Sequence, residues 1–215
     1  MAATTRNTIP SEAYVVGVLT AAFASWLLVY AAMFVLPSWH FAEAEPRYAT
    51  VARGKTGTVV ELDALVQALR ASPSRSDLSR AAFIQMLTAQ QIGLRSLRAT
   101  TRLTAARRDL RLGLASSPSD AYAWTRLAIS EFRLDHRAEA AAALAMALQV
   151  APAERKLTPV HFDLGVALWL DLSRAGRDAL ARRLKLAERW PEQKTTLNGN
   201  SATALRARFA ALRGP

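Results

Sequence analysis

The chain has 215 residues, enough for one domain of ordinary size and a smaller element besides. Apolar residues make up 51% of it and charged residues 21%, with only 9 Gly and 9 Pro, which excludes a disordered, collagen-like or low-complexity protein. The absence of cysteine excludes disulfides, thiolate zinc sites, iron–sulfur clusters and cysteine nucleophiles. The net charge of +11 favours anionic partners without indicating which.

The first feature along the chain is a long uncharged segment. Residues 13–42 contain no Asp, Glu, Lys or Arg, and residues 14–36 are apolar almost without interruption. As a helix, the latter would be about 35 Å long, slightly more than the roughly 30 Å of a bilayer core. We therefore expect an N-terminal tail over residues 1–12 and a transmembrane helix over 13–37, with Pro37 marking its end.

A cleaved signal peptide is the alternative interpretation of this segment, because Ala42-Glu43-Ala44 has the small-x-small form of a cleavage site. A signal peptide has an apolar region of about 7 to 15 residues after a basic start. Here the apolar region is much longer, and only Arg6 precedes it. An uncleaved anchor in the lipid bilayer is favoured.

Small residues recur every four positions within the expected span, at Gly17, Ala21 and Ser25. This spacing places them on one helix face, where small side chains let a second transmembrane helix approach closely. The pattern predicts packing against another membrane protein, although Ala-rich spans also produce such spacing by chance.

A juxtamembrane linker is expected over residues 38–57, followed by an all-α domain over 58–215. Thr58 and Glu61 have the spacing of a capping box ahead of a short amphipathic helix. The sequence Ser-Pro-Ser-Arg-Ser-Asp over 72–77 predicts a turn and the start of a second helix. A further helix is expected over 101–115, with a break after it.

Residues 121–154 resemble one tetratricopeptide (TPR) repeat, a helix–turn–helix unit of about 34 residues. The matching positions are Trp124, Leu127 and Ala128 on the first helix and Ala140, Leu144, Ala147 and Pro152 on and after the second. Glu131 departs from the family pattern, which has an aromatic residue there. Weaker matches on either side extend the resemblance over about 87–191. The alternative is an unrelated bundle of Ala-rich helices.

In the TPR family the first helix of each repeat lines a concave groove that binds partners. The resemblance therefore implies partner-binding positions at Tyr122, Thr125, Ile129, Phe132, Arg133, Phe162 and Trp169. Several of these are too apolar to remain in water, so either a peptide partner or the chain's own helix around 202–212 should cover them. Trp124 is expected to be largely buried within its repeat.

Residues typical of catalysis or metal binding are not apparent. His40, His136 and His161 are scattered, without a second ligand at helical spacing, and the common nucleophile and nucleotide motifs do not occur. We expect no enzyme activity, no metal and no cofactor.

Basic residues gather between positions 95 and 111. They are Arg95, Arg98, Arg102, Arg107, Arg108 and Arg111. Such a group is most often a solvated face, and the alternative is contact with an anionic membrane surface or polymer. Nucleic-acid binding is not expected, because this segment has no aromatic residues for base stacking.

The whole layout looks like the small membrane-anchored TPR proteins that accompany exopolysaccharide or O-antigen machinery in bacteria. This resemblance implies a scaffold or adaptor of an envelope complex in the inner membrane. A single uncleaved anchor commonly leaves its short N-terminal tail in the cytoplasm, so we expect the helical domain in the periplasm. The rival interpretations are a subunit of an envelope-polymer enzyme and a basic module that binds anionic lipid or polymer. The sequence does not indicate the oligomeric state.

Overall fold

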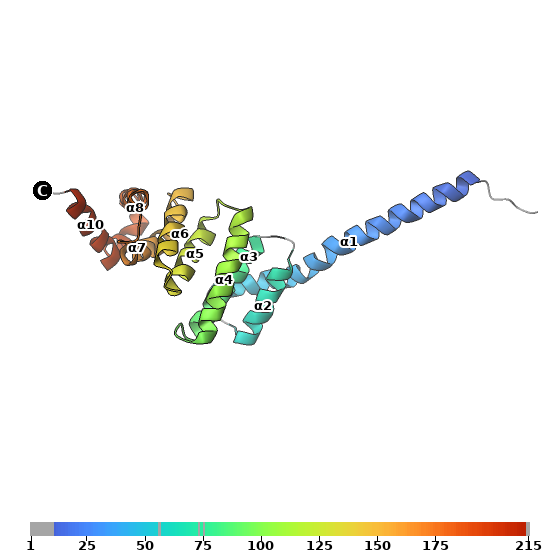
Figure 1. The fold of residues 1–215 in the computed structure, drawn as a ribbon, viewed down its shortest axis with the longest axis horizontal. Helices are drawn as coiled ribbons and strands as arrows, with labels where there is room; N and C mark the ends of the chain where they lie inside the picture. The colour runs from blue at the N-terminus through green and yellow to red at the C-terminus, as the bar shows by residue number, and fades with distance from the viewer. Residues whose placement is uncertain (1–10, 56, 73, 75, 214–215) are drawn as a thin grey trace, which may run out of the picture.

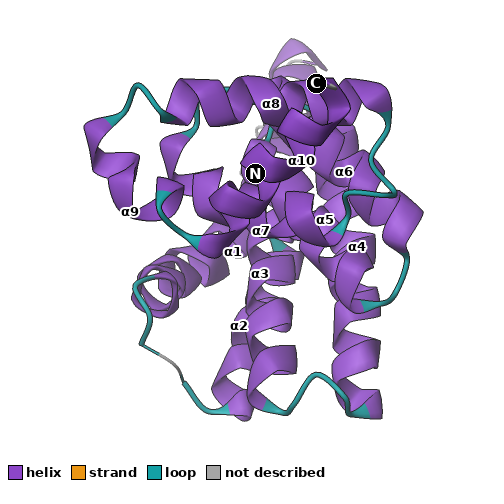
Figure 2. Ribbon diagram, turned by 90° about the vertical axis from the view of Figure 1, so that its left-hand side faces the viewer, coloured by secondary structure: helices purple, strands orange, loops and turns teal. Residues whose placement is uncertain are grey.

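The computed structural model describes the backbone of residues 11–55, 57–72, 74 and 76–213, and along the first helix the side chains of 19–31 and 44–52 only. The described part of the chain is helical and contains no strand, as the all-α prediction requires (Figures 1 and 2). Its α-helices are α1 (Ser11–Ala52), α2 (Val59–Ala71), α3 (Ser76–Gln91), α4 (Leu97–Ser116), α5 (Ala121–Arg133), α6 (Arg137–Val150), α7 (Thr158–Ala167), α8 (Arg174–Ala187), α9 (Lys194–Leu197) and α10 (Asn200–Arg213). Two single 3₁₀ turns, η1 (Arg155–Leu157) and η2 (Pro191–Gln193), precede α7 and α9.

Helix α1 is a single helix of 42 residues that extends away from the other helices (Figure 1). The expectation that Pro37 ends it is wrong, and most of the expected linker over 38–57 is helical. A proline inside a helix removes one backbone hydrogen bond and costs about 3 kcal/mol. The helix nevertheless continues, because its last turns are held by packing against α2 and α3.

The last turns of α1 belong to a small apolar core. Ala44 and Val51 are buried against the inner face of α2, and the ring of Tyr48 packs edge-on against Phe83 of α3. Glu45 accepts a hydrogen bond of 2.5 Å from Arg80 of α3. The projecting part of α1 is thus joined to the helical domain without a flexible connection.

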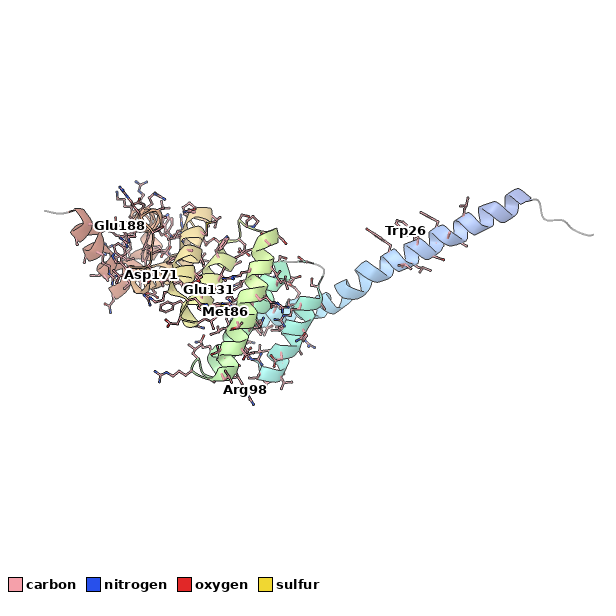
Figure 3. The ribbon with its side chains drawn as sticks, in the orientation of Figure 1. Trp26, Met86, Arg98, Glu131, Asp171 and Glu188 are labelled. Carbon is pink, nitrogen blue, oxygen red and sulfur yellow. The ribbon has the colours of Figure 1, made fainter. Side chains whose placement is uncertain are left out.

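The N-terminal part of α1 is exposed where its side chains are described. Every residue of 19–31 is exposed, and Phe23, Trp26 and Tyr30 stack successively along one side of the helix (Figure 3). Over the described residues, none of the helices is both long and apolar enough for a membrane crossing. The side chains at both ends of the expected 13–37 span, including Gly17, lie outside the described residues, and Ala21 and Ser25 are exposed.

The remaining helices form antiparallel pairs that follow one another along the long axis of the molecule (Figure 1). The predicted capping box is confirmed, since Glu61 N–H donates to Thr58 Oγ1 and Thr58 N–H donates to Glu61 Oε2. Helix α4 begins at Leu97 rather than at Thr101, because Ser96 caps it through the N–H of Ala99.

Helices α5 and α6 form the helix–turn–helix that the sequence predicts over 121–154. Asp120 caps the first helix, and Asp135 reverses the chain with a φ of 63°. Small residues meet where the two helices touch, with Ala128 and Ala140 completely buried beside Leu144. This packing agrees with the role that the repeat pattern gives to its small positions.

The pair α7–α8 is shorter than the α5–α6 pair and depends on one glycine. A Cβ atom at Gly165 of α7 would collide with the side chain of Leu180 on α8. The absence of a side chain at Gly165 therefore sets how closely the two helices approach. Helix α10 then packs back on α7.

Candidate binding groove

A groove of about 300 Å³ lies between α3, α5 and the start of α7. Apolar side chains form most of its walls, and Met86 and Leu157 are buried in them. It is lined by Phe83, Met86, Leu87 and Gln90 of α3, by Tyr122, Thr125, Arg126, Ile129 and Arg133 of α5, and by Leu157 and Val160.

One face of α5 supplies much of this lining, because Arg126, Ile129 and Arg133 follow Tyr122 at intervals of three or four positions, with Thr125 next to Arg126, and so project to the same side of the helix. Four of the seven predicted partner-binding residues, Tyr122, Thr125, Ile129 and Arg133, meet in this groove. The sequence prediction missed the α3 side, because it named partner-binding positions only from Tyr122 onward.

The other three predicted residues lie elsewhere. Phe132 is half-buried beneath the guanidinium of Arg137. Phe162 and Trp169 are only 1% and 9% exposed, so they are core residues and not surface contacts. The ring of Trp169 packs edge-on against Phe209 of α10, with 5.0 Å between ring centroids.

The C-terminal helix therefore covers one end of the predicted surface and leaves the other open. The sequence predicted that either a peptide partner or the chain's own C-terminal helix would cover these residues. In the structure, α10 covers Trp169. Within the described residues, no helix covers the α5 groove, which stays accessible.

Two guanidinium groups line the groove, and no carboxylate does. Arg126 donates to the carbonyl and hydroxyl of Ser79 and lies 4.7 Å from the ring centroid of Phe83, which fixes its position. Burial lowers the pKa of Arg133, for which the described part of the chain provides no ion pair or hydrogen-bond acceptor. At the opposite end of α5, burial and the nearby Glu154 carboxylate raise the pKa of Tyr122.

Beneath the groove, Thr125 is paired with a completely buried histidine. Thr125 Oγ1 lies 2.7 Å from the Ala121 carbonyl oxygen, to which it donates, and 2.9 Å from His161 Nε2. Burial, and to a lesser extent the charge of Arg183, lowers the pKa of His161 to about 3. The imidazole is therefore neutral at physiological pH and acts as part of the core.

Sequence reasoning missed a buried carboxylate at Glu131, labelled in Figure 3. This side chain is 1% exposed and accepts hydrogen bonds from Arg111 at 2.7 Å and from His136 at 2.8 Å, with Arg107 at 3.6 Å. The departure of Glu131 from the repeat pattern could have predicted this cluster. An acidic residue at a buried apolar position requires nearby cations, and α4 supplies two of them.

The six arginines between 95 and 111 do not form one basic surface. Arg102 is bonded to Asp63, while Arg107 and Arg111 approach Glu131. Arg95, Arg98 and Arg108 are exposed and make no ion pair within the described residues, and Arg98 points away from the helices in Figure 3. Three of the six arginines thus form ion pairs that join helices within the domain.

Trp124 differs from its expected burial. It is half-buried, its indole N–H donates to the carbonyl of Pro118 at 2.8 Å, and it lines an open hollow of about 410 Å³ between α4 and α6. The family pattern places this side chain between the helices of one repeat, whereas here the neighbouring α4 leaves one side of the ring uncovered.

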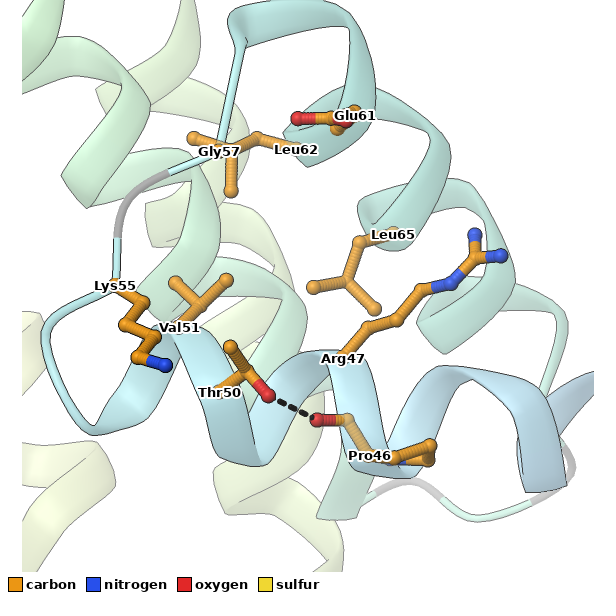
Figure 4. Close-up of a pocket in the computed structure, with 9 residues that line it drawn as sticks. All are labelled: Pro46, Arg47, Thr50, Val51, Lys55, Gly57, Glu61, Leu62 and Leu65. Atoms are coloured by element: carbon orange, nitrogen blue, oxygen red, sulfur yellow. Dashed lines mark hydrogen bonds between the residues drawn. The ribbon is translucent and has the colours of Figure 1, made fainter.

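A larger hollow of about 560 Å³ lies between the end of α1 and the start of α2 (Figure 4). Glu61 in its wall is occupied by the capping box, and Arg47 and Lys55 lie on opposite sides of the space. The side chains of Arg47 and Lys55 thus do not converge on one point of this hollow.

Comparisons with known proteins give no identification, because no family model, curated protein or solved structure matches the chain. Within the described residues, no three side chains of the metal-binding types come together. The function must therefore be inferred from the fold and from the groove along α5.

Proposed function

We propose that this protein is a membrane-anchored, TPR-like adaptor that holds protein partners together in a bacterial envelope complex. The observation that carries the proposal is the open groove along α5, which is largely apolar and contains four of the positions that the repeat pattern assigns to partner binding. A helical surface of this kind recognises partners by shape and by a few polar groups, without catalysis.

The membrane anchor is supported by the uncharged residues 13–42 and by the way α1 projects from the domain (Figure 1). The apolar side chains of 19–31 face outward on all sides of the helix, an arrangement that is unfavourable in water. We place the anchor in the inner membrane and the domain in the periplasm, and we assign the complex to polysaccharide synthesis or export on the resemblance of the layout alone.

The adaptor proposal is tested by substituting the groove in the full chain and purifying its complexes in mild detergent. Ile129→Asp introduces a charge into the apolar wall, while Leu112→Asp places the same charge at a 41% exposed apolar residue of α4. We expect Ile129→Asp to lose copurifying proteins that Leu112→Asp retains, with both variants remaining helical. Identical sets of copurifying proteins would contradict the proposal.

A second function has one observation in its favour, namely the exposed and unpaired Arg95, Arg98 and Arg108 in the described part of the chain. These could contact anionic lipid or polymer directly. Replacing all three by Gln should then abolish salt-sensitive binding of the full chain to anionic polymer without affecting partner proteins. Unchanged polymer binding would reject this role.

A further inference from the structure

Resting on the proposed function of the α5 groove as the partner site, we infer the chemistry of its ligand. It is an internal, extended segment of a partner protein in which an Asp or Glu side chain, bound by Arg133, neighbours a large apolar side chain. The argument depends on the charges of the lining, on the state of Arg133 and on the dimensions of the groove.

The charge of the lining is entirely positive. Among the described residues, Arg126 and Arg133 are the only ionisable groups of the lining other than the Tyr122 phenol, and both project from the same face of α5. An anion entering the groove therefore meets two guanidinium groups and no repelling carboxylate in the lining itself. Charge complementarity selects an acidic ligand over a neutral or basic one.

The two arginines differ in what they can still bind. Arg126 already donates to Ser79 and is stacked on Phe83. Arg133 is half-buried, and neither an acceptor nor an acidic partner for it is found among the described residues. A carboxylate can accept two parallel hydrogen bonds from a guanidinium, and in a partly desolvated site this pair is stronger than in water. Its arrival would also offset the burial that lowers the pKa of Arg133.

The position of the acid along the groove is set by Glu154. This carboxylate lies near Tyr122, at the end of α5 opposite to Arg133. Repulsion between like charges keeps an acidic side chain away from the Tyr122 end and directs it to Arg133. The ligand thus has a defined orientation in the groove.

The large apolar side chain of the ligand is inferred from the groove walls between Tyr122 and Arg133. Phe83, Met86, Ile129 and Val160 line the space, and a volume of about 300 Å³ is at the small end of the range for ligand sites. Tyr122 is 37% exposed and Arg133 is half-buried, so the groove reaches solvent at both ends of α5. An extended chain can enter at one end and leave at the other, which favours an internal segment over a terminal carboxylate.

The test uses the full chain in detergent and a positional library of acetylated, amidated octapeptides. Four central positions vary among Asp, Glu, Asn, Gln, Lys, Leu and Phe, and blocked termini remove the terminal charges. Binding is measured by fluorescence anisotropy for the wild type, Arg133→Gln, Arg133→Lys and the matched control Arg182→Gln, an exposed arginine on α8. Circular dichroism verifies that each variant remains helical.

We expect pools that combine Asp or Glu with Leu or Phe to bind at least about tenfold more tightly than their Asn or Gln counterparts. Arg133→Gln should abolish this difference, Arg133→Lys should retain only part of it because it lacks the planar fork, and Arg182→Gln should preserve it. Apolar pools that bind equally with acid or amide would overturn the inference and leave the groove as a partner site. Failure of every pool to bind would count against both the inference and the proposed function.

Discussion

Arg183 on α8 provides a direct test of how the helical pairs are joined. It is 1% exposed, and its guanidinium donates to the carbonyls of Ala151 at 2.7 Å, of Pro152 at 2.6 Å and of Glu154. These carbonyls belong to the turn between α6 and η1, and those of Ala151 and Glu154 also accept backbone hydrogen bonds, from the N–H groups of Glu154 and Leu157. Replacing Arg183 by Met keeps the length of the side chain and removes every donor.

The expected loss of stability is the balance of two effects. Hydrogen bonds from a charged group contribute about 1.5 to 3 kcal/mol each, and three are lost. Burial lowers the pKa of Arg183 to about 10, so burying this charge costs about 3 kcal/mol, which the substitution recovers. We therefore expect Arg183→Met to lower the free energy of unfolding by about 1.5 to 6 kcal/mol.

Urea denaturation of the full chain in detergent, followed by far-ultraviolet circular dichroism, measures this loss. The adjacent Arg182 is exposed, so Arg182→Met is a matched control that should change stability by less than about 0.5 kcal/mol. Equal stability of the two variants would show that the three hydrogen bonds of Arg183 do not hold the turn.

Four further results are expected. Gly165→Ala should destabilise the domain by about 1 to 3 kcal/mol in the same assay, since its Cβ collides with Leu180; an unchanged midpoint would mean that α7 and α8 are not in close contact. Trp124→Ala should cost about 1 to 3 kcal/mol, less than a fully buried Trp, and a loss above about 4 kcal/mol would refute its half-buried position. Burial lowers the pKa of His161 from 6.5 to about 3, so between these two values the unfolded chain binds a proton that the folded chain does not. The contribution of His161 to the free energy of unfolding is therefore complete above pH 6.5 and falls by about 1.4 kcal/mol per pH unit below it. His161→Gln should reduce this dependence of stability on pH, and an equal dependence in both proteins would reject the lowered pKa. Alkaline phosphatase fused after residue 215 should be active if the domain is periplasmic, whereas a stable inactive fusion would place it in the cytoplasm.

The helical architecture after position 58 could largely be predicted from the sequence, because it depends on local signals. The capping box at Thr58 and the helix pair over 121–154 are set by residues close in sequence. The continuation of α1 through Pro37 could not be predicted, because it depends on distant packing of Tyr48 and Glu45 against α3.

The α5 side of the candidate groove could also be predicted from the sequence. The α5 face follows from helical periodicity, so Tyr122 and Ile129 could be placed together. The α3 wall and the pairing of Glu131 with Arg111 arise from tertiary contacts between separate helices, for which one sequence carries little information. Phe162 and Trp169 were misplaced because α10 returns to cover them.

The central claim, that a membrane-anchored domain binds a protein partner along α5, is tested most directly by site-specific photocrosslinking in intact membranes. A photoreactive amino acid is placed at Ile129, inside the groove, and separately at exposed Leu112 on α4. We predict that the chain sediments with the membrane and that the Ile129 position alone forms a discrete adduct with another protein, identified by mass spectrometry. A chain recovered in the soluble fraction, or an Ile129 position that forms no adduct beyond those of Leu112, would contradict the account.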